Sequence, residues 1–325
     1  MTVGSYIRKV SLVITTKNNG TVEIYDLSEL HIVFKVTANV QQTPNSANIK
    51  VYNLNNNTYK SIIDNSAGAE VVLSAGYDDN FGIIFKGQIT QIFRNKESNI
   101  DTNLNIIAID GDNIFSDGFV SLSEERGTSP NSRLYTIVNN STEPTSIDKI
   151  EETKTNEEKS VRGKVYFGLV KEELRKSTSA NGQLWYIKNN KVVVYSTSIY
   201  TEEAKKTTIL NHKTGMIGFP TQTQEGINVK TLLNPNIVEG DAIEVNSNSI
   251  QLEEISTDRT NIDKYTQSSI NSDGVYRILQ VSHEGDNRGQ EWYSNLITVN
   301  ANVLYVENKA QQEVSTIPTV IPIKR

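Results

Sequence analysis

Short runs in which apolar and polar residues alternate fill the first third of this chain. Between Tyr6 and Ile109 these runs are separated by segments rich in Asn, Asp and Gly. A period of two is the spacing of a strand that buries one face. Turn signals such as Asn18-Asn19-Gly20 allow the left-handed conformations that tight hairpins need. The region therefore predicts a small antiparallel barrel or sandwich with hidden edges, plus one short helix over Asn55–Ile63.

Strand patterns return after Ile209. Ile227–Leu233 and Ala242–Val245 are separated by Asn-Pro and Glu-Gly-Asp, where Pro cannot donate to a ladder and Gly admits positive φ. We expect these two strands to be adjacent in a small antiparallel sheet. Gly274–Val281 and Glu291–Val299 are expected to form a long hairpin.

The middle of the chain has a helical pattern followed by a hairpin pattern. Val161–Ser177 carries an apolar stripe opposite charged residues, which predicts a helix. Leu184–Ile187 and Val192–Tyr195 flank the turn Lys188-Asn189-Asn190-Lys191 and predict a hairpin, with Trp185 and Tyr195 packing on the helix.

Two further features of this middle region are a helix start and a polar stretch. Ser129-Pro130-Asn131 predicts a second helix across Arg133–Val138, because Ser or Asn can cap it and Pro suits its first turn. Thr142–Ser160 is highly charged with almost no apolar residues, so we expect a solvated loop.

The chain of 325 residues is longer than one hydrophobic core usually grows, so several domains are expected. Alternation stops at Asp110, and Asp117-Gly118 follows closely, which suggests a boundary near 118. We predict a mainly β (α+β) fold: two antiparallel β-barrels, 1–118 and 206–304, flank a small α/β helix-plus-hairpin module, 119–205. The Pro-containing residues 305–325 are predicted to be an extended C-terminal tail.

Composition excludes several classes of protein. The net charge of −6 argues against sequence-specific nucleic-acid binding, which needs clustered Lys and Arg. The absence of Cys excludes disulfides, thiolate catalysis and thiolate metal sites. The longest apolar runs are far short of the roughly 20 residues that span a bilayer, and Val10–Ile14 is too short for a signal sequence. We expect a soluble, non-secreted chain with no membrane insertion.

Candidate chemical groups are few. His283, Glu284 and Asp286 could be an acid/base or metal cluster, but they lie in a Gly-rich hairpin tip where turn geometry explains such residues. His31 and His212 have no companions at useful spacing. We therefore favour a structural turn for the cluster.

Asp110-Gly111-Asp112-Asn113 resembles the start of a calcium loop, but Phe115 stands where an EF-hand needs Gly. A boundary turn is the better interpretation. The sequence contains no nucleophile elbow, zinc-protease or phosphate-loop motif. We predict no catalytic, cofactor-binding or metal residues and no enzyme, although a hydrolase could hide in two distant carboxylates.

A weak internal similarity links the two β regions. Thr43-Pro44-Asn45 followed by Ile49–Leu54 has the order of Gln224–Leu233, and in each case later strand patterns follow in a similar sequence. Chance matches between β segments are common. A duplication is one interpretation of the similarity.

With these residues in view, the chain resembles the baseplate hub family of tailed bacteriophages. Three pieces carry the likeness and span most of residues 5 to 300: Thr43–Leu54 with Gly76-Tyr77 and Phe85-Lys86-Gly87; Ile217–Pro235; and Asp273–Tyr293. The resemblance implies two tube-type barrels per chain and a structural virion protein at the tail tip or baseplate, assembled in the host cytoplasm.

The resemblance also implies partners. It implies a homotrimeric hub whose pseudo-sixfold ring joins the hexameric tail tube protein to the trimeric central spike protein, with tape measure and baseplate wedge proteins as further contacts. Three copies at −6 give −18, and a lumen of that sign would let passing DNA slide. Two alternatives stay open: a host-recognition or adhesin tail module, and a tail-associated peptidoglycan hydrolase.

Overall fold

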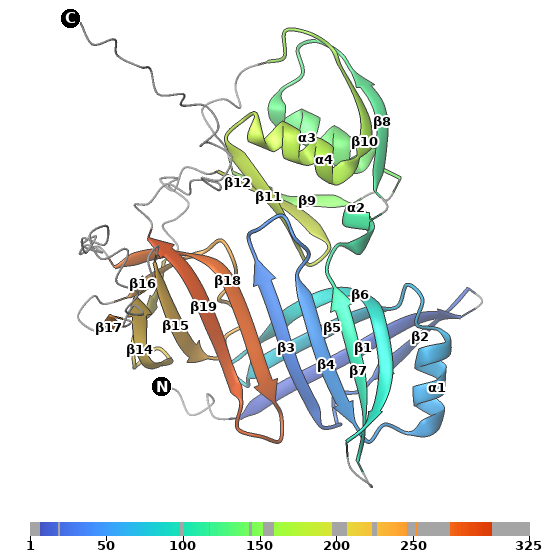
Figure 1. Ribbon diagram of the computed structural model, residues 1–325, viewed down its shortest axis with the longest axis vertical. Coiled ribbons are helices and arrows are strands. Elements are labelled where there is room, and N and C mark those ends of the chain that lie inside the picture. The colour runs from blue at the N-terminus through green and yellow to red at the C-terminus, as the bar shows by residue number, and fades with distance from the viewer. Residues whose placement is uncertain are drawn as a thin grey trace, which may run out of the picture.

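The computed structural model describes residues 7–18, 20–97, 101–116, 118–142, 145–151, 159–196, 207–222, 226–245, 251–252 and 274–300. Most of these residues lie in strands, which confirms the predicted mainly β fold. Figure 1 shows a broad twisted sheet with a smaller module of helices and strands above it. The predicted tail, 305–325, lies outside the described residues, as does almost all of the segment 246–273.

The first unit of the sheet, residues 7–109, contains seven strands and one helix. In chain order these are β1 (Arg8–Asn18), β2 (Thr21–Asp26), β3 (Ile32–Asn39), β4 (Ser46–Tyr52), α1 (Asn56–Asp64), β5 (Glu70–Tyr77), β6 (Asn80–Lys96) and β7 (Thr102–Ile109). The spatial order is β3-β4-β7-β6-β5-β1-β2, with every pair antiparallel. Alternate residues of these strands are buried in one core, as the period-two pattern predicts. Helix α1 confirms the predicted short helix, and the side chain of Asn55 caps it.

The second unit, residues 207–300, contains β13 (Thr207–Leu210), β14 (Met216–Gln222), β15 (Ile227–Leu232), β16 (Ala242–Val245), β17 (Gln251–Leu252), β18 (Val275–Asp286) and β19 (Trp292–Asn300). β18 and β19 confirm the long hairpin. The predicted adjacency of β15 and β16 is wrong, because β19 and β18 lie between them. The segment with Asn-Pro and Glu-Gly-Asp therefore crosses over β19 and β18 to reach β16. Its short length in the sequence suggested a direct turn between neighbouring strands.

The two units repeat one strand order. The first contains β3-β4-β7-β6-β5-β1, and the second contains β14-β15-β19-β18-β16-β13 in the corresponding places. Their registers also agree: Gln88 of β6 lies opposite Ile109 of β7, and Arg277 of β18 lies opposite Val299 of β19. Each long strand then has one extra residue, Thr90 in β6 and Leu279 in β18. This shared bulge confirms the internal repeat that the sequence only suggested.

The units are joined edge to edge rather than closed separately. β18 pairs with β16 through its first residues, and its residues Gln280–Asp286 pair antiparallel with β3. The result is one branched 14-stranded sheet. No closed barrel is formed within the described strands. In the first unit, the edge of β3 that closure would use is paired with β18 of the second unit.

The α/β module lies between the units in sequence. It contains β8 (Phe119–Glu124), α3 (Pro130–Asn139), β9 (Ser146–Ile150), β10 (Lys164–Leu169), α4 (Val170–Ser179), β11 (Gln183–Lys188) and β12 (Lys191–Ser196), and the short α2 (Asp112–Ser116) leads into it. The helices lie between a β8–β10 pair and a β9–β12–β11 sheet (Figure 1). Ser129 caps α3 with Pro130 in its first turn, as predicted. The turn at Asn189 and Asn190 has positive φ, which confirms the hairpin signal.

The predicted helix over Val161–Ser177 is wrong in its first half. Lys164–Leu169 is a strand paired with β8, and the helix begins only at Val170. Val165 and Phe167 lie on an exposed face while Tyr166 is buried, so the residues alternate as a strand does. The spacing of Val161, Val165 and Leu169 fits a helix equally well, and pairing with a distant strand decided between them.

Two smaller expectations about the module also need correction. Within Thr142–Ser160, predicted to be a loop, Ser146–Ile150 forms β9 and pairs parallel with β12. Trp185 packs against the helices as expected, but Tyr195 does not. Since Tyr195 lies opposite Leu184 in the hairpin, it belongs to the other face from Trp185.

Candidate functional site

The candidate cluster at 283–286 does not converge on one point. His283 is buried, and its Nδ1 lies 2.7 Å from Ser294 Oγ. Burial lowers the pKa of His283 to about 4, so the ring is neutral near pH 7. Glu284 projects from the other face of β18 and forms an ion pair of 2.7 Å with Lys35. Within the described part of the chain, no three His, Asp or Glu residues are grouped to hold a metal.

Asp110 is buried and connects the end of β7 to the module. Its Oδ1 accepts a hydrogen bond of 2.6 Å from the backbone N–H of Asn190, in the turn of the module hairpin. The backbone N–H of Gly111 donates in return to Asn190 Oδ1 at 3.0 Å. Burial raises the pKa of Asp110 to about 6. The side chains of Asp112 and Asn113 are outside the described structure.

The remaining histidines have structural neighbours. His212 lies edge-on to Phe219, with ring centroids 5.6 Å apart. His31 stacks on Tyr52, and its Nε2 lies 2.8 Å from Asp286 Oδ1. Asp286 and His31 are 255 positions apart in the chain, so no local spacing in the sequence could have paired them.

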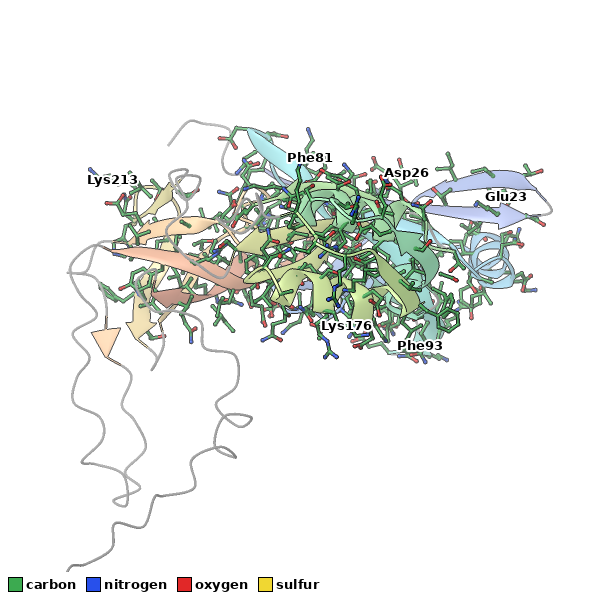
Figure 2. The ribbon with its side chains drawn as sticks, turned by 90° about the horizontal axis from the view of Figure 1, so that it is seen from above. Glu23, Asp26, Phe81, Phe93, Lys176 and Lys213 are labelled. Carbon is green, nitrogen blue, oxygen red and sulfur yellow. The ribbon has the colours of Figure 1, made fainter. Side chains whose placement is uncertain are left out.

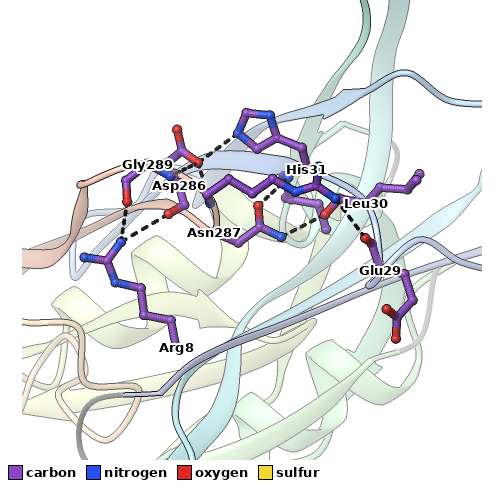
Figure 3. A network of polar contacts seen from close by, with 9 residues as sticks. Arg8, Glu29, Leu30, His31, Asp286, Asn287 and Gly289 are labelled. Atoms are coloured by element: carbon purple, nitrogen blue, oxygen red, sulfur yellow. Dashed lines mark hydrogen bonds and ion pairs between the residues drawn. The ribbon is translucent and has the colours of Figure 1, made fainter.

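The site that the fold does build is the junction between the two units, at the tip of the β18–β19 hairpin (Figure 3). Arg8 of β1 donates from Nη1 to the carbonyl of Gly289 at 2.6 Å and from Nη2 to the carbonyl of Gln290 at 3.1 Å. Asp286 Oδ1 accepts from the backbone N–H groups of Arg288 and Gly289 at 2.8 and 2.7 Å. Burial acts to raise the pKa of Asp286, but these hydrogen bonds and the one from His31 lower it on balance.

Asn287 makes the complementary contacts from the same tip. Its Nδ2 donates to the carbonyl of Leu30 at 2.8 Å, and its Oδ1 accepts from the backbone N–H of Ile32 at 2.9 Å. Leu30 lies in the connection from β2 to β3 (Figure 3), and Ile32 is the first residue of β3. The tip thus satisfies backbone groups of the first unit that β18 itself does not reach.

Apolar packing closes the junction beneath these polar contacts. Trp292 belongs to the core of the first unit although β19 belongs to the second. Its ring meets Phe34 edge-on, with centroids 5.5 Å apart. Gly285 lies against both rings, and a Cβ there would collide with Phe34 and Trp292. The part of the motif from Gln280 to Trp292 therefore lies at the interface between the units, where Gly285 leaves room for two aromatic rings.

The module is fixed to both units by a second small core of Val40, Leu184, Tyr186, Val193 and Tyr195. The Tyr195 hydroxyl donates to the carbonyl of Val40 at 3.0 Å, and the Tyr186 hydroxyl donates to the carbonyl of Glu239 at 3.2 Å. The Tyr195 hydroxyl therefore contacts the first unit, and the Tyr186 hydroxyl contacts the second. Burial raises the pKa of Glu239 to about 7.

Buried cores and hydrogen bonds join the two units and the module to one another. Four titratable candidates each contact a structural partner: His283, Glu284, Asp286 and Asp110. Sequence reasoning found the hairpin tip as a turn, but it missed Arg8 and Asn287. No local sequence pattern marks these two residues, because each forms hydrogen bonds with a segment more than 250 residues away in the chain.

Comparison with known proteins identifies the family. A model of the family described as baseplate hub gp41 matches residues 9–250, which is most of the chain. The chain belongs to the baseplate hub gp41 family. It is a structural protein of the bacteriophage tail, located in the baseplate of the virion.

Solved structures support the fold. A tail protein from Neisseria meningitidis has a TM-score of 0.53 at 10% identity, over 90% of this chain and 97% of its own. A 43 kDa tail protein of prophage MuSo2 from Shewanella oneidensis has a TM-score of 0.55 at 10% identity, over 90% and 98%. A search of curated protein sequences found no match. Among the residues that the structure describes, no helix is long and apolar enough to cross a membrane.

Proposed function

We propose that this hub protein acts as a homotrimer that joins the hexameric tail tube to the trimeric central spike and lines the channel through which DNA passes. The observation that carries the proposal is the repeated unit. Two units of equal strand order in one chain give six similar units in a trimer, so a threefold particle can present near-sixfold geometry at one end. The other end remains free to follow threefold symmetry.

The proposal includes a division of labour along the chain. Residues 1–118 and 206–304 form the wall of the ring, and the module 119–205 distinguishes one end from the other. Separate buried cores for the first unit, the module and the second unit support this division. The role is geometric, without catalysis or a cofactor, and the structural partners of His283, Glu284 and Asp286 support that part.

Native mass spectrometry of the full chain tests the proposal. We expect a mass of three chains for the hub alone, a complex of three hubs with three spike chains, and a complex with the tube protein. An unrelated trimeric protein in place of the spike controls for nonspecific adducts. A monomer that binds neither tube nor spike would contradict the proposal. Receptor binding or cell-wall clearing by such a monomer would favour an adhesin or a hydrolase.

A further inference from the structure

One edge of β10 in the module is open. β10 and β8 form a two-stranded sheet, and in the described structure no strand lies on the other edge of β10. The backbone N–H of Val170 donates to the carbonyl of Gly118 at 2.8 Å, which continues the same ladder by one pair. Because every second residue of an antiparallel strand bonds with a given neighbour, the even-numbered residues of β10 bond with β8. Val165 and Phe167 therefore direct their N–H and C=O groups to the open edge.

The side chains along this edge are apolar and exposed. Val165 and Phe167 are each 73% exposed, the largest values for large apolar side chains on the described strands. Phe167 meets Phe119 of β8 edge-on, with ring centroids 5.1 Å apart. The other residues on this face are also uncharged: Leu169, Ser121 and Ser123. An apolar strand with free backbone groups on one edge is suited to the addition of another strand.

A sequence near the C-terminus, outside the described residues, matches this edge. Ile317–Ile323 is Ile-Pro-Thr-Val-Ile-Pro-Ile, without a charged residue. Five of its seven residues are β-branched, which favours an extended strand. Pro318 and Pro322 lack an N–H group and are both even-numbered, so they remove hydrogen-bond donors from one edge of such a strand only. The odd-numbered residues keep every N–H and C=O group on the other edge.

The described chain ends beside the module. Asn300 of β19 lies opposite Tyr276 of β18. Arg277, the next residue of β18, contacts two residues of the module. Its Nη1 donates to the carbonyl of Ser196 at 3.5 Å, and its Nη2 lies 3.6 Å from Glu151 Oε1. The residues after Asn300 therefore start beside the β9–β12–β11 sheet.

The connection from Asn300 to Ile317 is long enough to reach β10. It contains sixteen residues, 301–316, and fully extended these span at most about 55 Å. The elements of the module are shorter, since the six-residue β10 is about 20 Å long and the ten-residue α4 about 15 Å. Figure 2, seen from above, shows Lys176 of the module between Lys213 of the second unit and Glu23 of the first. The module of the same chain is thus within reach.

We propose that Ile317–Ile323 adds to the open edge of β10 in its own chain as a third strand, with its odd-numbered residues hydrogen-bonded to Val165 and Phe167. Pro318 and Pro322 then lie on the outer edge, where no donor is needed, and they prevent a further strand from adding. The odd-numbered side chains lie beside Val165 and Phe167 on the same face and reduce their exposure. This inference goes beyond the hub role, because it depends neither on the number of copies nor on tube and spike.

Hydrogen exchange of the Val165 and Phe167 amides tests this pairing in the full chain. We expect these amides to exchange about tenfold more slowly in the unmodified chain than in a chain that ends at Thr316, because an unpaired edge amide is open to solvent. Two proline variants of full length provide matched controls. Ile321→Pro removes a donor on the pairing edge and should exchange as fast as the shortened chain. Val320→Pro removes a donor on the outer edge and should exchange as slowly as the unmodified chain.

Mixed copies test whether the segment stays with its own chain. The chain that ends at Thr316 also carries Lys164→Arg, which changes the mass of its β10 peptide, and it is co-expressed with the unmodified chain. We expect slow exchange only in the β10 peptide of the unmodified chain. Slow exchange in both peptides would place the segment on a neighbouring copy and overturn the assignment to the same chain.

Three results would overturn the strand addition itself. Fast exchange of Val165 and Phe167 in every protein would show that nothing covers the edge. Slow exchange in every protein, the shortened chain included, would show that another segment or another protein covers it. Equal exchange in Ile321→Pro and Val320→Pro would contradict pairing through the odd-numbered residues. If the shortened chain fails to fold, as thermal melts would reveal, the two proline variants decide alone.

Discussion

The two units of the sheet share an inner set of strands and differ at their periphery. β3-β4-β7-β6 and β14-β15-β19-β18 have the same order, direction and bulge. Beyond them, the first unit has long antiparallel strands β5, β1 and β2, whereas the second has four-residue strands β16 and β13 that pair parallel. Helix α1 separates β4 from β5, and the structure shows no helix between β15 and β16.

The difference shows which features the repeat preserves. Outer strands can shorten or reverse direction because they only cover one face of the core. β3 and β18 cannot, since each supplies the edge that pairs with the other unit. This pairing between units is seen once, between Gln280–Asp286 of β18 and β3. The matching residues Gln91–Lys96 of β6 pair with β7 on one edge and have no strand on the other edge within the described structure.

The largest expected effect compares matched core positions. Ile106 of β7 and Leu296 of β19 correspond by register, and both are buried. Replacing either with Ala removes buried apolar groups and leaves a cavity, so we expect each to lower the free energy of unfolding by about 2–5 kcal/mol. Urea denaturation of both variants measures this. A cost at 296 close to zero, with a large one at 106, would break the equivalence of the units.

A second comparison concerns pH. Asp110 follows β7, and Asn300 holds the corresponding place at the end of β19. Burial raises the pKa of Asp110 from 3.8 to about 6, so its contribution to stability is full below pH 3.8 and is lost as pH rises through about 6. The loss is about 3 kcal/mol. Asp110→Asn should remove it.

Denaturation midpoints of the unmodified chain and Asp110→Asn between pH 4 and 8 measure this difference. Glu239, with a pKa raised to about 7 mainly by burial, acts in the same direction in both proteins. Because the charge of Asp110 adds to that rise, the difference between the two profiles also contains a smaller contribution from Glu239. Parallel pH profiles for the two proteins would show that the carboxyl group carries no such cost.

A third comparison uses the edge of β18 that pairs with β3 and the matching edge of β6, which has no strand on it in the described structure. Gly285 in β18 corresponds to Lys96 in β6. Gly285→Val should lower the free energy of unfolding by about 1–3 kcal/mol, because the added side chain collides with Phe34 and Trp292. Lys96→Val should change stability by less than about 0.5 kcal/mol, since this position is exposed. Thermal melts at low protein concentration distinguish the two, and equal losses would contradict the assignment of an open edge.

The smallest expected effect is that of the ion pair across the closed edge. Lys35 and Glu284 are 2.7 Å apart, with Lys35 largely exposed. Glu284→Gln should lower stability by about 0.2–1 kcal/mol, and 0.5 M NaCl should reduce the difference. Chemical denaturation at two salt concentrations measures it. A loss that salt leaves unchanged would point to packing in place of charge.

Local signals in the sequence predicted much of the fold. The alternating runs of the first unit, the short helix α1, the Ser129-Pro130 start of α3 and the Asn189-Asn190 turn all appear where their local chemistry places them. The error at 164–169 has the same origin: its spacing is compatible with two structures, and only the distant partner β8 selects the strand.

The candidate site divides in the same way. The sequence by itself determined that the tip at 285–289 is a turn and that Asp110 ends a strand, because turn geometry depends on neighbouring residues. Only the tertiary structure decided that Asp286 meets His31, that Gly285 leaves room for two aromatic rings, and that β18 binds β3 while the matching edge of β6 is open. Strand pairing joins residues far apart in the chain through backbone groups that every residue shares, and such groups leave no mark of their partner in the sequence.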